Sequence, residues 1–452
     1  MWIILAVLVA VTQANDNLKV VYEWKQIDFE YPNIQERQFA ISNGNFIQEN
    51  VIPVGLEVYK DRLFLTLPRW KKGVAASLAY IDLNDNMTDK SPQLKPYPSW
   101  SAHQMSQDEV PEIISPFRVR ADACSRLWVL DTGIDNILGE SNATVLAPTR
   151  LLIYDLHSDN LLRTFTFPPE YLKEESFFAS IAVEDDDCEN TYAYAADLGK
   201  PSLVVYSWKS QGSWRIQHNF FHPDPTAGNF SINGINFQWN DGLFGLALSK
   251  PQADGETILY FHPFVSKDEF SVSTKYLKDP NTANNANYHE FKRLGTRGEN
   301  AQSNAEFLDK NTGVLFYTLP NLNAIACWKT TTKEYNLKSQ GRIFMDKVLM
   351  EFPNDVKVDD KKRLWVISDR LQKFMYDNLD PNEVNFRILM APVKEAIEHT
   401  ACDVKTKPLP EIITKLNDII KPTTNAPVSK DSAGTLEASL LIISVAVLSR
   451  LL

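Results

Sequence analysis

Apolar strands and tight polar turns alternate along most of the chain. Six segments share one pattern, in which an extended stretch is followed by a polar turn and then by an apolar strand. Gly, Asp and Asn favour turns, and β-branched and aromatic residues favour strands, so the pattern predicts β-hairpins. The six segments are residues 55–67, 119–131, 183–197, 235–248, 306–319 and 356–369.

The spacing of the hairpins indicates a repeat architecture. Equivalent positions in successive segments, starting at Leu63, lie 64, 64, 52, 71 and 50 residues apart. Each interval suits one four-stranded blade. The repeats occupy nearly all of the 452 residues without a linker, and the sequence has no long helical periodicity. We therefore expect one nearly all-β body, a closed array of repeats, rather than several domains.

Both ends of the sequence differ from the repeats, which are expected to cover residues 15–402. The apolar run at residues 2–10 precedes Ala14 and predicts a signal peptide over residues 1–14, although no Lys or Arg precedes the run. Residues 403–434 are rich in Lys, Pro and Thr and predict a linker.

The end of the chain, residues 435–452, is an apolar tail. Thirteen residues interrupted by Arg450 are too short to span a bilayer comfortably. Small residues, a spacer and a terminal apolar segment resemble a GPI-attachment signal. The alternative is an unstructured tail without a function.

The four cysteines predict two disulfides in an oxidising compartment. Cys124 and Cys188 each lie three residues before the equivalent position of consecutive repeats, which brings both to one face. Cys327 and Cys402 then pair by elimination. Each bridge would close a loop of more than sixty residues and stabilise the fold by ~4 kcal/mol in the chain-entropy model. Four free, buried thiols are the alternative. The sequence holds no C-x-x-C or Cys/His cluster, so no metal site is predicted.

Three sequons predict N-glycosylation. Asn86, Asn142 and Asn229 each begin an Asn-x-Ser/Thr triplet in a polar stretch between the repeat cores. A glycan is tolerated on such a surface stretch, so we expect at least one of the three to be occupied.

The charge balance argues against nucleic acid as a partner. The chain carries 46 Lys and Arg against 57 Asp and Glu, a formal net charge of −11, and no basic run is interleaved with aromatic residues. An acidic surface mildly favours cationic ligands.

Several motifs resemble a known family. They are LWVLDTG at 127–133, AADLG at 195–199, Arg297-Gly298 with Gln302-Ser303, NTGVLFYTL at 311–319, FPNDVKVDDKKRLWVISDR at 352–370 and EVNFRI at 383–388. In content and order they are similar to the insect Yellow and major royal jelly protein family, over roughly residues 18–402. The resemblance implies a secreted six-bladed β-propeller, which agrees with the six repeats counted above.

The resemblance also implies a range of functions. Proteins of this family influence melanin pigmentation of the cuticle, some convert dopachrome, some salivary members bind biogenic amines in the central channel, and the royal jelly branch is nutritive. The apolar tail departs from the usual family pattern, so a surface-anchored form is an alternative to free secretion.

The repeat phase predicts which residues surround the channel. The innermost strand of each blade lines the axis of a propeller, and we expect this strand to precede each tight turn. Counting back from the equivalent positions selects strand ends at one mouth of the channel, to which the family-like motif adds a glutamine. The ligand-binding candidates are Phe117, Arg118, Phe178, Ser180, Asn233, Gln302, Asn304, Asn354 and Asp355.

These candidates predict a polar pocket with an aromatic side. Asn and Asp are disfavoured in strands, so their recurrence at the channel ends favours side chains that point inward. Phe117 and Phe178 are expected to supply an aromatic face, and Asp355 to pair with the ammonium group of a catecholamine or indoleamine. The alternatives are side chains that cap backbone groups and a channel that holds only water.

The tryptophans and some aspartates repeat at equivalent positions, which indicates architecture. Trp128 and Trp365 share a phase in the second strand and are expected to pack between blades. Asp131, Asp197 and Asp369 are expected to fix the turns that follow them.

Three functions remain open. The first is a binder of small aromatic amines or of catechol and indole metabolites, with a role in pigmentation. The second is an isomerase of dopachrome-like quinones, in which Asp355, Arg118 or Arg297 would act. The third is a storage or structural glycoprotein. The sequence shows no nucleophile or metal-ligand motif, so no catalytic residue and no cofactor is predicted, and the oligomeric state is left open.

Overall fold

The computed structural model describes residues 17–83, 88–105, 110–139, 141–173, 175–281 and 287–403. In these residues, six four-stranded antiparallel sheets form successive blades. Blade one contains β2 (Gly55–Tyr59), β3 (Arg62–Thr66), β4 (Leu78–Asp82) and β5 (Lys95–Pro96). Blade two contains β6 (Pro116–Ala121), β7 (Arg126–Asp131), β10 (Arg150–Asp155) and β11 (Leu161–Thr166). Blade three contains β12 (Phe178–Glu184), β13 (Tyr192–Asp197), β14 (Ser202–Ser207) and β15 (Gly212–Ile216).

The second half of the chain repeats this plan. Blade four contains β18 (Leu243–Leu248), β19 (Ile258–Pro263), β20 (Asp268–Ser273) and β21 (Lys292–Thr296). Blade five contains β22 (Glu306–Asp309), β23 (Val314–Leu319), β24 (Ala324–Lys329) and β25 (Gln340–Met345). Blade six contains β26 (Pro353–Val358), β27 (Arg363–Ser368), β28 (Phe386–Pro392) and, as its outer strand, β1 (Lys19–Trp24).

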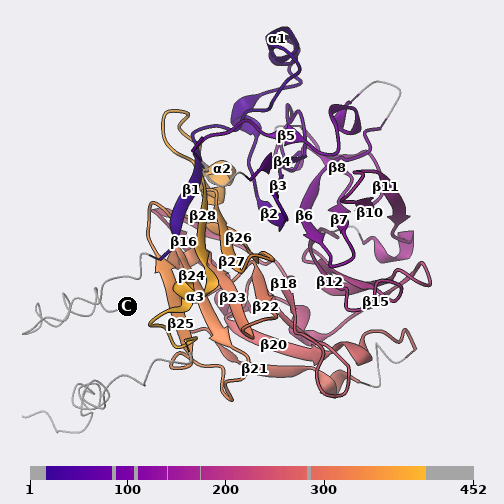
Figure 1. Cartoon of the computed structure of the whole chain (residues 1–452), viewed down its shortest axis with the longest axis vertical. Helices are drawn as coiled ribbons and strands as arrows, with labels where there is room; N and C mark the ends of the chain where they lie inside the picture. Colours follow the sequence, from indigo (N-terminus) through magenta and orange to yellow (C-terminus); the bar gives the residue numbers. More distant parts are fainter. Residues whose placement is uncertain are drawn as a thin grey trace, which may run out of the picture. The chain divides into compact units, whose positions relative to one another are not determined.

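The six blades close into a ring, which Figure 1 shows with the inner strands nearest the centre. Each inner strand contacts the next, in the order β2, β6, β12, β18, β22 and β26, and β26 contacts β2 again. Strand β1 pairs with β28 from Lys19 opposite Met390 to Trp24 opposite Phe386. The first and the last strand of the propeller therefore share one sheet, which closes the ring. The predicted all-β, six-bladed propeller is confirmed.

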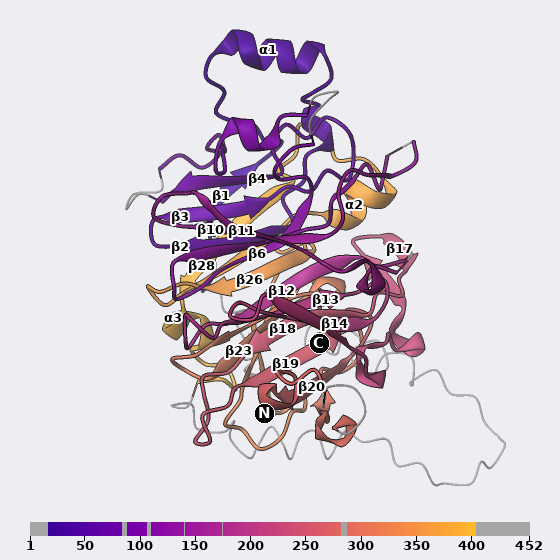
Figure 2. The same cartoon turned by 90° about the vertical axis from the view of Figure 1, so that its right-hand side faces the viewer.

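Several short elements lie outside the six blades. Helix α1 (Ile34–Ser42) projects from the first blade region, as Figure 2 shows. Helix α2 (Leu371–Tyr376) contacts the hairpin of β16 (Asn229–Ile232) and β17 (Ile235–Gln238). A second hairpin joins β8 (Ile134–Asp135) to β9 (Thr144–Val145), and helix α3 (Val393–Ile397) packs on β28. Among the described residues, no helix has the length and apolar character needed to cross a membrane.

The repeated tryptophans are core residues, as predicted. Trp128 is fully buried, and its indole Nε1 donates a hydrogen bond of 2.7 Å to Asp122, which also pairs with Arg126 at 2.6 Å. Blade six repeats the same arrangement with Asp359, Arg363 and Trp365. Because a buried carboxylate needs donors, the tryptophan and the arginine satisfy it together.

The repeated aspartates hold the turns that follow them through hydrogen bonds to backbone N–H groups, as predicted. The Asp131 carboxylate accepts hydrogen bonds from the backbone N–H groups of Ile114, Ser115 and Gly133, at 3.1, 2.7 and 3.1 Å. Asp197 accepts from Phe177 and Lys200 N–H in the equivalent place. These contacts tie the end of the second strand to the segment that enters the inner strand.

Both predicted disulfides are present, Cys124–Cys188 and Cys327–Cys402. The first joins the turns of blades two and three, and the second attaches the segment after α3 to β24 in blade five. The predicted signal peptide at 1–14, the tail at 435–452 and all of the linker except Asp403 lie outside the described residues.

The predicted hairpin of repeat four is wrong. Its first half is β17, which pairs with β16, and its second half is β18, which is the inner strand of blade four and pairs with β19. The run at 243–248 is fully buried, and the second strands of the other blades are buried except for the first residue of three of them. Hydrophobicity alone therefore does not distinguish an inner strand from its neighbour.

Candidate functional site

Two cavities follow one another along the propeller axis. The entrance cavity, of about 190 Å³, lies where the inner strands begin. The channel cavity, of about 210 Å³, lies further along the same strands. Consecutive residues separate the two: Phe117 lines the first and Arg118 the second, and Asn354 and Asp355 divide in the same way.

A polar layer lies between the two cavities. The Arg118 guanidinium donates hydrogen bonds to the carbonyl oxygens of Val54 and Asn354, at 2.5 and 2.6 Å, and to Oδ1 of Asn354 at 3.0 Å. Asn304 Nδ2 donates to the same Oδ1 at 2.9 Å. Burial lowers the pKa of Arg118. The structure thus brings three predicted residues together, and their polar groups bind one another.

This layer rests on Asp369, whose carboxylate accepts hydrogen bonds from Asn354 Nδ2 and from the backbone N–H of Leu371. Burial raises the pKa of Asp369 to about 8. The contacts orient the Asn354 amide, so its carbonyl oxygen faces Arg118 and Asn304. The layer therefore acts as a floor of set geometry beneath the entrance cavity.

Asp355 does not reach the aromatic cavity. Its carboxylate lines the channel cavity, where it pairs with Lys357 at 2.6 Å and lies 3.5 Å from Arg118. It also accepts the Leu56 backbone N–H at 3.0 Å, which links blade six to blade one. Burial lowers the pKa of Lys357. The expectation that Asp355 pairs with a ligand ammonium is therefore corrected. Its carboxylate is already bound by two buried cations of the chain, Lys357 and Arg118.

Aromatic rings form the wall of the entrance cavity. Phe117 lies at its centre, with ring centroids 5.2 Å from Trp70, 5.6 Å from Phe244 and 6.0 Å from Phe177. The aromatic wall consists of Trp70, Phe117, Phe177, Trp239, Phe244 and Phe264. Strands and loops of blades one to four contribute these rings, so the wall forms only when these blades pack together.

One carboxylate faces this wall. Asp241 lines the entrance cavity and is half-buried. Burial raises its pKa to about 6, and among the described residues no side chain or backbone group forms a hydrogen bond or ion pair with its carboxylate. A desolvated carboxylate without a partner favours a cation from outside the chain.

Asp241 was missed in the sequence because of the error in blade four. The segment Asn240-Asp241-Gly242 looks like a hairpin turn, which would place it at the far end of the blade. It instead precedes the inner strand β18, in the position that Asn304 occupies before β22. Correct phasing of blade four would have selected Asp241 in place of Asn233.

Comparison with known proteins identifies the family. The family model described as Major royal jelly protein matches residues 114–402. The chain is 38% identical over 410 residues to Protein yellow of Drosophila erecta, covering 89% of this chain and 74% of that protein. It is 39% identical over 402 residues to Protein yellow of Drosophila pseudoobscura pseudoobscura, covering 88% and 70%. The Drosophila melanogaster protein of that name is 38% identical over 410 residues, with coverages of 89% and 74%.

The chain belongs to the Yellow and major royal jelly protein family. In this Yellow-family propeller, two further candidates lie away from the cavities. Asn233 is exposed at the tip of the β16–β17 hairpin with a φ of 47°, and its Nδ2 donates to the Lys347 carbonyl. Gln302 is buried, but its Nε2 donates to the Ala227 carbonyl at 2.7 Å. Both side chains hold the hairpin against blade five.

In blade three of this Yellow-family chain, the residue that lines the entrance cavity lies one position before the predicted Phe178. Phe178 packs away from the cavity against Phe167, with centroids 5.1 Å apart, while its neighbour Phe177 lines the entrance cavity. A register shift lies between Phe178 and Ser180, as one does near the start of the inner strands of blades two, four and six. Ser180 lines the channel cavity, so it lies on the axis but below the aromatic wall.

A second polar cluster was not predicted at all. His262, Glu269 and Glu306 converge between blades four and five, where their ligand atoms lie within 4.8 Å of one another. Arg297, which would act in the isomerase hypothesis, binds Glu269 at 2.7 Å, and its side chain is fully buried. It is absent from the lining of both cavities. The three residues come from different strands, and no local motif of the sequence connects them.

Proposed function

We propose that this Yellow-family protein binds small aromatic amines in the entrance cavity and acts outside the cell on catechol or indole metabolites of melanin formation. The half-buried Asp241 carboxylate beside an aromatic wall carries the proposal, because no described residue pairs with it. An ammonium group would supply the missing charge, and the neighbouring rings would contact the aromatic part of the ligand. The role in pigmentation rests on family membership.

The size of the cavity favours a small ligand. Its volume of about 190 Å³ lies below the roughly 300 to 1,000 Å³ of pockets that hold drug-sized molecules. The floor beneath it offers few free polar groups, because Asn304 and Asn354 already bind each other. Recognition should therefore depend on the ammonium group and on ring contacts rather than on several hydrogen bonds.

Calorimetry with dopamine and serotonin tests the proposal. Asp241→Asn should weaken dopamine binding at least tenfold and leave any binding of 4-methylcatechol, which has no ammonium group, unchanged. Phe117→Ala should weaken the binding of both dopamine and 4-methylcatechol, since it removes the central ring of the aromatic wall. Asp254→Asn, a change at an exposed aspartate that lines neither cavity, is the matched control. Absence of heat with both amines would remove the amine hypothesis.

A second candidate function, isomerisation of dopachrome, is favoured by the same residue. A general acid or base works best with a pKa near the operating pH, and burial raises the pKa of Asp241 to about 6. The isomerisation only relocates a proton, so one such group suffices. Decay of dopachrome absorbance should then be faster than with heat-denatured protein and should slow in Asp241→Asn. A rate equal to that of the denatured control would exclude the enzyme.

Secretion is part of the proposal. Two disulfides suit an oxidising compartment, and the predicted signal peptide agrees with it. Asn142 and Asn229 are exposed, as glycosylation sites must be, whereas Asn86 lies outside the described residues. Attachment through a GPI anchor stays a prediction. Release of the protein from cells by a phosphatidylinositol-specific phospholipase would support the anchor, and release without the enzyme would support free secretion.

A further inference from the structure

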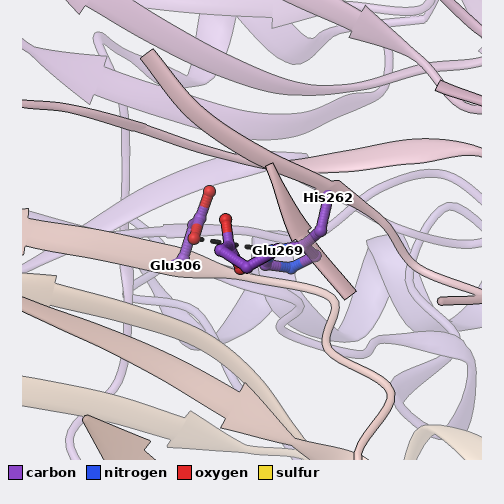
Figure 3. A group of neighbouring side chains, drawn as sticks. All are labelled: His262, Glu269 and Glu306. Carbon is purple, nitrogen blue, oxygen red and sulfur yellow. Dashed lines mark hydrogen bonds and ion pairs between the residues drawn. The ribbon is translucent and has the colours of Figure 1, made fainter. Parts of the chain in front are cut away.

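Three buried side chains between blades four and five form a compact cluster, which Figure 3 shows. His262 comes from β19, Glu269 from β20 and Glu306 from the inner strand β22, and all three side chains are inaccessible to solvent. Nδ1 of His262 lies 3.0 Å from Oε2 of Glu269 and 3.4 Å from Oε2 of Glu306. The imidazole thus faces both carboxylates at once.

Most of the polar atoms in this cluster are unsatisfied. Within the described part of the chain, no hydrogen-bond partner exists for Oε1 of Glu269, for either oxygen of Glu306 or for Nε2 of His262. Buried polar atoms are nearly always hydrogen-bonded, because leaving one without a partner forfeits its hydration. Three unsatisfied carboxylate oxygens in one place point to a bound positive species.

The charges of the cluster are compatible with a cation. Arg297 binds Glu269 at 2.7 Å, whereas Glu306 has no arginine or lysine partner among the described residues. With a neutral imidazole, two carboxylates and one guanidinium leave a net negative charge. A divalent ion would be held by this charge and by the direct bonds to its ligands.

We propose that His262, Glu269 and Glu306 bind a divalent transition-metal ion, with Zn²⁺ as the best-fitting probe. One imidazole nitrogen and two carboxylates are a donor set that such ions accept. Ligand atoms about 2.0 to 2.2 Å from a tetrahedral zinc ion lie about 3.3 to 3.6 Å from each other. The separations of 3.0 and 3.4 Å in the structure are close to that value, so little movement is required.

The local fold holds the imidazole in this place and leaves an approach to it. Gly245 lies opposite His262 in the pairing of β18 with β19, and a Cβ at Gly245 would come within 2.3 Å of the imidazole ring. Only glycine therefore leaves room for the ring. Glu306 also lines the channel cavity, through which an ion and its fourth ligand could enter.

A protonated His262 is the competing explanation. The two carboxylates raise the pKa of His262 above its ordinary value, although burial and Arg297 oppose the charge. A doubly protonated imidazole donates from Nδ1 to both carboxylates and makes the cluster neutral. The Nε2–H group of such an imidazole has no acceptor in the described part of the chain, and Oε1 of Glu269 and Oε1 of Glu306 have no donor there.

Metal analysis of the secreted wild-type protein is the first test. Protein stripped with a chelator and dialysed should bind one Zn²⁺ per chain in calorimetry, and elemental analysis should find the ion after gel filtration. Glu306→Gln and Glu269→Gln should weaken this binding roughly 100-fold or more, because each removes a charged ligand. Glu351→Gln, which changes a buried carboxylate paired with Arg370 in another blade, should leave it unchanged.

A measurement on the wild-type protein tests the proposal even if the variants fail to fold. Anomalous scattering from zinc-soaked crystals should place the ion between the three side chains. No zinc binding, or binding that persists in both glutamine variants, would overturn the proposal and leave protonated His262 as the explanation. The entrance cavity shares no lining residue with this cluster, so amine binding and metal binding succeed or fail separately.

Discussion

Replacement of Asp355 by alanine should destabilise the propeller strongly. The exposed fraction of the Asp355 side chain is 1%, and those of its partners Arg118 and Lys357 are 3% and 10%. Removing one partner of a buried ion pair costs about 3 to 5 kcal/mol, because the other charge stays buried without compensation. The Leu56 N–H also loses its acceptor, which costs about 1 to 3 kcal/mol.

These two contributions overlap, so we expect a loss of about 4 to 6 kcal/mol in the free energy of unfolding. Urea denaturation followed by tryptophan fluorescence measures it. Asp355→Asn keeps the volume and an acceptor for Leu56 and should show the charge contribution alone. Asp61→Ala, which breaks an exposed pair with Lys361, should cause no measurable change.

The pH dependence provides an internal check. Burial lowers the pKa of Lys357 in the folded protein, and loss of the neighbouring carboxylate should lower it further. The unfolded chain then binds more protons than the folded variant, so the stability of the variant should rise with pH from neutrality towards pH 10. A variant within about 1 kcal/mol of wild type at neutral pH would refute the assignment of Asp355 as a structural ion-pair residue.

Three further predictions concern single positions. Calorimetry should show dopamine affinity falling roughly tenfold from pH 7.5 to pH 5, because Asp241, with a pKa raised to about 6, loses its charge on protonation; Asp241→Asn should show no such change. Gly245→Ala should lower the free energy of unfolding by about 1 to 3 kcal/mol, since its Cβ would meet His262 at 2.3 Å. Gly212→Ala, whose Cβ meets nothing closer than 3.4 Å, should have little effect, and equal losses would contradict the steric argument. Cys402→Ser opens a loop with a sequence separation of 75 and should cost about 4 kcal/mol in urea denaturation, and an unchanged midpoint would refute the entropic account.

Sequence periodicity was sufficient where the physical cause is local. Alternating apolar positions and turn residues identified five of the six hairpins, and the matched places of Cys124 and Cys188 identified one bridge. The equivalent phases of Trp128 and Trp365 correctly indicated core packing. The same phase correctly placed Asn304 and Asn354 on the propeller axis, because each lies at or just before the start of the inner strand of its own blade.

What a side chain contacts across blades was decided by tertiary structure alone. Asp355 has the position expected from the sequence, but the neighbouring cations Arg118 and Lys357 bind its charge. Asp241 remains without such a partner, and His262 meets Glu306 only because β19 and β22 pack in adjacent blades. Hydrophobic periodicity records which face of a strand is buried. It does not indicate which distant strand packs on that face. The charged groups that this packing brings together determine the chemistry of the site.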